Sequence, residues 1–330
     1  MARGLDMSPR GLVPVFAVAV VCASLAPSSF PAAAQESWTV PRTPEGHPDL
    51  GAVWTNETIT PFERPSALAG VAVLTEEQAA ALEARTAERR SASDTNPRPG
   101  VVGAYNQFWM DAGVQVLKTR QTSLVVDPPD GRVPARPEAE ATRDFNHAHE
   151  GDSYAYMSVW DRCISRGVPG SMFPAAYNNA YRFLQIPGYV VIVHEMIHDV
   201  RVIPLDGRPH IDPRITLWMG DSRGRWEGDT LVVETANYNA RGWIATNAAS
   251  GRVKGLPVSE ELHVVEQFTR VDEDTLHYEV TVTDPKAYTR PWTVAMPMTR
   301  RPDYVLFEYA CHEGNHAVIN ILSGARVQDR

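Results

Sequence analysis

Two histidines and a glutamate, His194, Glu195 and His198, stand in the H-E-x-x-H order of zinc-dependent hydrolases. On an α-helix, residues four apart share a face, so both imidazoles can bind one zinc ion while the glutamate activates the water on it. On a strand, four residues span about 13 Å, so the two histidines cannot reach one ion, and the glutamate points to the other face. The backbone conformation of this segment therefore decides whether zinc chemistry is possible.

The residues around this motif favour a strand. The segment 189–205 is rich in valine and isoleucine, and the turn formers Pro187-Gly188 and Asp206-Gly207 bound it. We therefore expect one long strand and no metal site. A zinc metallohydrolase that uses His194, Glu195 and His198 is the least favoured of three functional alternatives.

A second sequence motif that is typical of enzymes, Gly220-x-Ser222-x-Gly224, matches the nucleophile elbow of serine hydrolases. That elbow needs a strand before the serine and a helix after it. The residues that follow contain Glu227-Gly228-Asp229 and indicate a hairpin instead. The motif is therefore not expected to carry a nucleophile.

Strand alternation places two glutamates on apolar faces. Glu266 shares a face with the apolar residues of 262–270, and Glu308 with those of 304–310. A carboxylate inside a β-sheet protein has to be paired, hydrogen-bonded or protonated, because an isolated buried charge costs too much free energy. Each of these glutamates is therefore expected either to have a structural partner or to take part in chemistry.

A third glutamate, Glu195, is expected to share one face of its strand with Arg201, while His198 lies on the other face. In the structural interpretation, Arg201 or Arg290 pairs with such carboxylates. In the catalytic interpretation, two carboxylates with shifted pKa values flank a ligand as acid and base. The candidate catalytic residues are Glu195, Glu266, His198 and Glu308.

Candidate ligand contacts lie on the same predicted strand, in the loop after it and in the next hairpin. Loops at strand ends are a common place for such contacts. The candidates are Arg201, Arg208, His210, Asp221 and Trp226. The sequence contains no phosphate-cradling glycine loop and no nicotinamide-binding motif, so we expect no organic cofactor.

Several longer motifs run through the chain. They read E-M-I-H-D at 195–199, L-D-G-R-P-H at 205–210, G-D-S-R-G-R-W-E-G-D-T-L-V-V at 220–233 and E-Y-A-C-H-E-G-N at 308–315. With these motifs the chain resembles a family of secreted bacterial proteins of unknown function, and the resemblance extends over nearly the whole chain after residue 34. The resemblance implies secretion but no mechanism. The family pattern does not require the histidine before E-M-I-H-D, which disfavours the zinc interpretation further.

The N-terminus predicts a secretory signal peptide at residues 1–34. Arg3 and Arg10 precede an apolar run over 12–25, and Ala32-Ala33-Ala34 offers a cleavage site. The run is too short for a membrane span, so we expect no membrane insertion after cleavage and a periplasmic or extracellular location.

Cleavage would leave two cysteines, Cys163 and Cys311, of the three in the chain. In an oxidising compartment we expect them to form a disulfide, with two buried free thiols as the alternative. The formal net charge of -9 argues against nucleic acid and anionic membranes as partners. The expected partner is a small-molecule or carbohydrate ligand.

The order of elements predicts a mainly β fold. Residues 35–121 read as an extended, proline-rich arm anchored by Trp38 and Trp54, followed by one surface helix that the capping box Thr75-x-x-Gln78 begins. Residues 122–330 read as a β-rich domain, since short β-branched runs alternate with turns and no βα alternation occurs. The predicted strands are 122–126, 180–186, 189–205, 223–226, 230–235, 262–271, 275–284, 292–296 and 304–311.

Sequential hairpins of this kind indicate an antiparallel meander that closes into a barrel or a strongly curved sheet, with a calycin-like barrel as one possibility. The first functional alternative is a hydrolase, lyase or isomerase that acts on a small molecule or sugar through paired carboxylates. The second is a non-catalytic ligand-binding or scaffold barrel. Whether the protein is an enzyme stays open at this stage.

Overall fold

The computed structural model describes residues 38–95, 110–247 and 254–328. The predicted signal peptide lies outside these residues. Residues Trp38–Arg330 form one compact unit, and this unit is mainly β, as predicted.

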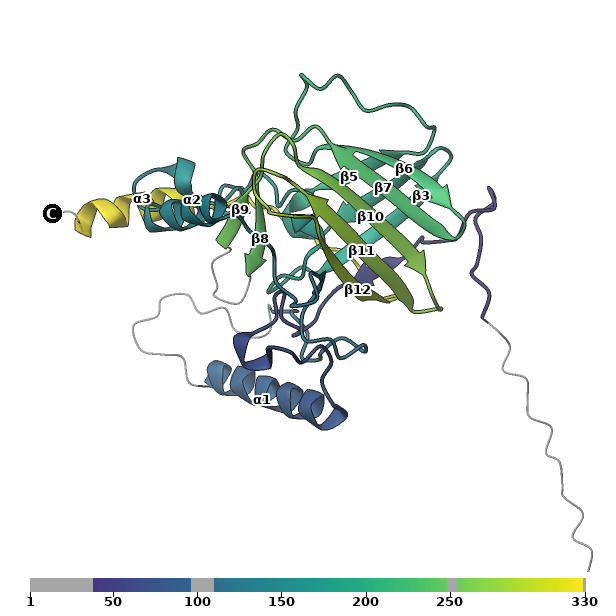
Figure 1. The fold of residues 1–330 in the computed structure, drawn as a ribbon, viewed down its shortest axis with the longest axis horizontal. Helices are drawn as coiled ribbons and strands as arrows, with labels where there is room; N and C mark the ends of the chain where they lie inside the picture. The colour runs from purple at the N-terminus through teal and green to yellow at the C-terminus, as the bar shows by residue number, and fades with distance from the viewer. Residues whose placement is uncertain (1–37, 96–109, 248–253, 329–330) are drawn as a thin grey trace, which may run out of the picture. The chain divides into compact units, whose positions relative to one another are not determined.

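Nine antiparallel strands wrap into a nearly closed barrel (Figure 1). Their order along the sheet is β5-β4-β3-β1-β12-β11-β10-β7-β6. Most neighbours in this order also follow one another in sequence, so the barrel is a set of meanders, as predicted. The strands are β1 (Val53–Thr55), β3 (Ala180–Ile186), β4 (Tyr189–His194), β5 (Val200–Pro204), β6 (Asp221–Glu227), β7 (Thr230–Ala236), β10 (His263–Arg270), β11 (Thr275–Thr283) and β12 (Trp292–Arg300).

Smaller elements surround the barrel. Strand β2 (Val125–Asp127) pairs with β12, and β8 (Trp243–Asn247) pairs with β9 (Lys254–Pro257) as a separate ribbon. Short 3₁₀ turns are η1 (Ser66–Leu68), η3 (Tyr154–Tyr156), η4 (Gly170–Met172) and η5 (Met196–His198). The helices are α1 (Glu76–Thr95), α2 (Pro137–Ala148) and α3 (Ala317–Gln328).

The short strand β1 joins the two halves of the sheet, because it pairs with β3 on one side and with β12 on the other. Its central residue, Trp54, is fully buried and donates its indole hydrogen to the Leu50 carbonyl at 2.9 Å. The predicted arm therefore contributes a strand to the barrel, and Trp54 is the anchor that the sequence predicted.

The predicted surface helix is confirmed as α1. The amide of Gln78 donates to the Thr75 hydroxyl at 3.2 Å, and the Thr75 amide donates to the Gln78 side chain at 2.9 Å. This is the reciprocal capping box expected from the sequence.

The other two helices correct the sequence interpretation. The sequence predicts a β-rich domain over residues 122–330, but α2 lies in it. This helix begins at Pro137 and has Glu138 and Glu140 in its first turn, which are favourable N-terminal residues. Helix α3 had not been expected either. None of the helices in the described residues is long and apolar enough to cross a membrane.

Two predicted strands are wrong. Residues 304–311 form no strand. The segment 189–205 is a hairpin of β4 and β5 in which Ile192 faces Arg201, and η5 makes the turn. Ile197 and His198 adopt left-handed φ values of 61° and 47° there. This conformation costs a β-branched residue free energy and is kept only where the surrounding structure enforces it.

The predicted disulfide between Cys163 and Cys311 is present. It joins the segment before β3 to the segment before α3, at a sequence separation of 148. A disulfide of this kind fits an oxidising compartment.

The barrel is least continuous where β5 meets β6, because the sheet's hydrogen-bonded order ends at these two strands. Gly224 on β6 allows them to approach. A Cβ atom at this position would lie 2.7 Å from Leu205 Cδ2 and 2.8 Å from Ile203 Cγ2. Close packing of side chains from β5 and from Leu205, the residue after it, onto the Gly224 backbone therefore closes the barrel here.

Gly224→Ala is expected to lower the free energy of unfolding by about 1–3 kcal/mol, since the added methyl group overpacks this contact. Urea unfolding followed by tryptophan fluorescence measures the change. Gly324→Ala in α3 is a suitable control, because nothing lies within 4 Å of its Cβ position and alanine favours a helix by about 0.5–1 kcal/mol. A Gly224→Ala protein as stable as the wild type would contradict the close packing proposed for β5 and β6.

Candidate functional site

A buried ion pair crosses the barrel interior. Glu266 on β10 is fully buried, as strand alternation predicted, and Arg201 on β5 approaches it with both terminal nitrogens. Arg201 Nη1 lies 3.1 Å from Glu266 Oε1, and Nη2 lies 2.5 Å from Oε2. Tyr278 on β11 donates its hydroxyl to Oε1 at 3.0 Å. Such a bidentate pair is strong and geometrically specific.

Further polar groups surround this pair, although Arg201 Nε has no hydrogen-bond partner. Arg201 Nη2 also donates to the Ser222 hydroxyl at 3.2 Å, and Ser222 contacts the Thr235 hydroxyl at 3.0 Å. Burial lowers the pKa of Arg201, but Glu266 more than offsets this and raises it overall. Arg201 therefore stays charged, and the pair connects β5 to β10 and, through Ser222, to β6, near the place where the barrel is least continuous.

Glu195 lies elsewhere, at the start of the η5 turn. It is 2% exposed, and its Oε1 accepts hydrogen bonds from the Tyr304 hydroxyl at 2.8 Å and from the Phe307 amide at 3.2 Å. Its other oxygen, Oε2, is buried and has no hydrogen-bond partner. The expectation that Glu195 and Arg201 share a strand face is wrong, because the chain reverses direction between them.

The other predicted catalytic residues do not join these two. His198 is exposed on the η5 turn, with its ring 6.1 Å from that of His312. Glu308 is exposed in an irregular segment, so its predicted place on an apolar strand face is wrong. The predicted acid and base, Glu195 and Glu266, belong to separate networks with different partners.

The H-E-x-x-H segment is neither the α-helix that a zinc site needs nor the single strand that the sequence indicated. His194 ends β4 and is buried inside the barrel, whereas His198 is exposed. Within the part of the chain that the structure describes, no group of three or more His, Cys, Asp or Glu side chains is placed to hold a metal ion.

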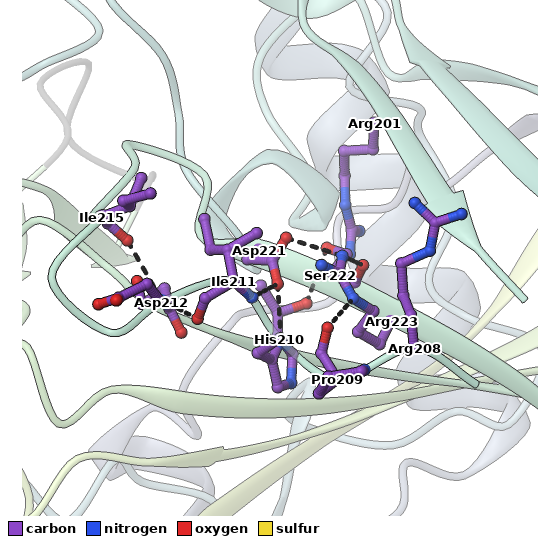
Figure 2. A network of polar contacts seen from close by, with 12 residues as sticks. Arg201, Arg208, Pro209, His210, Ile211, Asp212, Ile215, Asp221, Ser222 and Arg223 are labelled. Atoms are coloured by element: carbon purple, nitrogen blue, oxygen red, sulfur yellow. Dashed lines mark hydrogen bonds and ion pairs between the residues drawn. The ribbon is translucent and has the colours of Figure 1, made fainter. Parts of the chain in front are cut away.

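Figure 2 shows the polar network of the loop between β5 and β6. His210 Nδ1 lies 2.8 Å from Asp221 Oδ2, and the Arg223 guanidinium donates to Asp221 Oδ1 at 2.7 Å and to the Pro209 carbonyl at 3.0 Å. Arg208 pairs with Asp206 on the exposed side of the same loop. The predicted residues His210 and Asp221 thus hold this loop against β6, whereas Arg208 pairs within the loop.

The larger of two neighbouring hollows lies between the N-terminal arm and β3, with a volume of about 650 Å³. Its charged lining residues are Arg42, Glu45, Asp49, Arg182 and Arg300. Arg182 is exposed and has no ion-pair partner within the described ranges. Thr43 Oγ1 and Arg300 Nε are buried and make no hydrogen bond. Arg182 therefore offers unused hydrogen-bond donors to the hollow.

A smaller hollow of about 150 Å³ continues from the first and shares Thr43, Glu45 and Gln185 with it. Trp226, one of the predicted ligand contacts, lines this part and stacks on His47 at 5.1 Å between ring centroids. Tyr189 lies beside them. We call the two hollows together the arm cleft.

Long-range contacts fix the arm over the cleft. Gln185 on β3 donates to the Pro48 carbonyl and accepts from the Leu50 amide, at 2.9 and 2.7 Å. Arg42 pairs with Asp229 at 2.8 Å, and Arg270 donates to the Asp49 carbonyl at 2.9 Å.

Sequence reasoning missed Thr43, Arg182 and Arg300. Arg182 alone carried a local signal, as a charged residue at an outward position of a predicted strand.

Comparisons of the chain with family models, with curated proteins and with solved structures returned no match. The resemblance to a secreted bacterial family therefore stays a prediction.

Proposed function

We propose that this protein is an exported, non-catalytic β-barrel that binds a small acidic carbohydrate in the arm cleft. The observation that carries the proposal is the composition of that cleft, in which an arginine-rich half adjoins an aromatic half. Concave sites with a few convergent polar groups are the usual places for small ligands.

The arginine-rich half suits a carboxylate. Arg182 and Arg300 both line the larger hollow. Arg182 has no ion-pair partner within the described ranges, and Arg300 makes long ion pairs with Glu273 at 3.6 Å and Asp274 at 3.9 Å. Guanidinium groups bind carboxylates through paired, charge-assisted hydrogen bonds.

The aromatic half suits the apolar face of a sugar ring. Trp226 and Tyr189 line it, and the stacking of His47 on Trp226 holds the indole in place. Aromatic rings combine a large apolar area with a defined orientation.

The arrangement of the glutamates favours binding over catalysis. An acid and base pair has to reach a common substrate, but Glu266 is sealed in its pair with Arg201 while Glu195 is held by Tyr304. Neither glutamate lines the arm cleft. The paired-carboxylate enzyme is therefore the less supported alternative.

Trigalacturonate is expected to bind the full-length mature chain in isothermal titration calorimetry, and neutral galactotriose is expected to bind more weakly. Arg182→Ala should weaken trigalacturonate binding by about tenfold or more, the effect of losing one charge-assisted contact. The same substitution should leave galactotriose binding nearly unchanged.

Arg214→Ala is the matched control, because Arg214 is an exposed arginine that pairs with Asp212 outside the cleft. If Arg182→Ala and Arg214→Ala lose equal affinity for trigalacturonate, the binding reflects general charge attraction and not a defined site. If trigalacturonate does not bind at millimolar concentration, the proposal of an acidic carbohydrate ligand is wrong.

A further inference from the structure

The outer face of the sheet beside the arm cleft is apolar. Strand pairing places the outward residues of β3, β4 and β5 in three rows that run across the strands. The first row is Arg182, Val193 and Val200, the second is Leu184, Val191 and Val202, and the third is Ile186, Tyr189 and Pro204. We call the surface that these rows form the valine face.

Much of the valine face is open to solvent. Val200 is 52% exposed and Ile186 is 53% exposed, and Leu184 and Val202 are exposed as well. The residue Ile192, which points inward from the middle strand, is fully buried. Contiguous apolar side chains over several strands are uncommon on the surface of a soluble protein and often mark a place where a ligand or partner binds.

The valine face is continuous with the arm cleft. Arg182 and Leu184 line the larger hollow, and Ile186 lines the smaller one. From Leu184 the second row crosses β4 at Val191 and reaches Val202 on β5. Two strand spacings separate the ends of this row, so it leads about 10 Å away from the cleft. A ligand held in the cleft therefore has an apolar surface beside it on which a chain can lie.

The charge on this surface lies at its cleft end. Apart from Arg182, the three rows contain no charged residue. Arg182 is exposed and has no ion-pair partner within the described ranges. A guanidinium group beside an apolar strip is complementary to a molecule with an acidic head and an alkyl chain. A second copy of this chain would also cover the valines, but it would give no role to the residues that the valine face shares with the cleft.

We propose that the ligand of the arm cleft is an acidic glycoside whose alkyl chain lies along the second row of the valine face. This proposal rests on the proposed function, because it takes an acidic sugar in the cleft as its starting point. Each methylene group that leaves water adds to the affinity. Since the face is open, the chain is covered on one side, so it strengthens binding but is not required for the sugar to bind.

Octyl glucuronide and methyl glucuronide are the probes, because they share the acidic sugar and differ in the alkyl chain. Calorimetry on the full-length mature chain, below the micelle concentration of the octyl compound, should show that octyl glucuronide binds about tenfold or more tightly than methyl glucuronide. The double variant Val191→Thr/Val202→Thr keeps the branched side-chain shape and adds hydroxyl groups to the path of the chain. It should bind octyl glucuronide about threefold or more weakly than the wild type and methyl glucuronide equally well.

Val126→Thr/Val271→Thr is the matched control, since both valines lie outside the valine face and are 40% and 51% exposed. This variant should bind octyl glucuronide as the wild type does. Octyl glucoside carries the same chain on a neutral sugar and should bind more weakly than octyl glucuronide.

The outcomes separate this proposal from the proposed function. Equal affinities for the two glucuronides, or wild-type affinity for octyl glucuronide in Val191→Thr/Val202→Thr, would overturn the alkyl-chain site and leave the acidic carbohydrate standing. The same holds if trigalacturonate binds and octyl glucuronide does not. If octyl glucoside binds as tightly as octyl glucuronide, or if neither trigalacturonate nor octyl glucuronide binds, both proposals are wrong. In sedimentation, a wild-type dimer that dissociates in Val191→Thr/Val202→Thr would show that a second copy covers the valine face and would also overturn the alkyl-chain site.

Discussion

Arg201→Met is expected to lower the free energy of unfolding by about 3–5 kcal/mol at neutral pH, the usual cost of leaving one buried charge without its partner. Glu266 would keep the Tyr278 hydroxyl as a donor but lose both contacts with the guanidinium. Since Glu266 is fully buried, water cannot replace the lost partner without opening the barrel. Urea unfolding at pH 7.5 measures the loss.

Two further variants define the cause. Arg290→Met removes a partner from a pair whose side chains are each 49% exposed, so a change of no more than about 1 kcal/mol is expected. The double variant Arg201→Met/Glu266→Leu removes both charges and should recover most of the lost stability, as replacement of whole buried pairs often does. A single Arg201→Met variant with wild-type stability would mean that the pair does not hold the barrel together.

The regular parts of the sheet could be predicted from the sequence because alternation and turn residues agree there. In 262–270 the inward residues alternate strictly with outward ones, so the buried position of Glu266 followed directly. Glycine at the β3–β4 and β6–β7 turns, Gly188 and Gly228, has left-handed φ values of 78° and 59°. Such positions favour glycine, so a glycine between two β-branched runs predicts the turn from the sequence.

The β4–β5 hairpin could not be recognised from the sequence, for two physical reasons. Its outer face is apolar as well as its inner face, and Val202, for example, is 56% exposed beside the buried Ile203. The run therefore shows no alternation to mark its ends. The turn itself uses Ile197 and His198 in the left-handed conformation, where glycine or asparagine would be expected. Strand parity across this hidden turn then gave the wrong face for Arg201.

The arm cleft could not be predicted, because tertiary contacts alone create it. Thr43 and Arg300 lie 257 positions apart in sequence numbering and line the same hollow. Trp226 was a correct candidate in the sense that it lies in this cleft. Its partner His47 comes from the arm, which carries no strand or helix pattern.

The acid sensitivity of the barrel should depend strongly on His194. Neither ring nitrogen of His194 has a well-formed hydrogen bond, and the ring packs edge-on against Tyr181 with 5.4 Å between centroids. Burial, with a smaller effect of Arg201, lowers the pKa of His194 from 6.5 to about 3, and a contact with the Ser171 backbone offsets only a part of this. The folded protein therefore holds this histidine in its neutral form.

The sign of the pH dependence follows from this lowered pKa. In the unfolded chain His194 binds a proton below about pH 6.5, whereas in the folded chain it does so only below about pH 3. The stability contribution is therefore complete above about pH 6.5 and is lost as the pH falls from about 6.5 to about 3. At about 1.4 kcal/mol per pH unit, the full loss is on the order of 5 kcal/mol.

His194→Phe should remove this dependence, because phenylalanine fills a similar volume and carries no ionisable group. Between pH 7 and pH 4.5, urea unfolding should show the wild type losing roughly 2–3 kcal/mol more than the variant does. The control His316→Phe lies at an exposed position before α3. Its free energy of unfolding should fall between pH 7 and pH 4.5 by as much as that of the wild type. If the wild type and His194→Phe lose equal stability as the pH falls, groups other than His194 take up the protons that accompany acid unfolding. A steeper wild-type curve would instead identify His194 as a buried neutral histidine that makes this barrel unstable in acid.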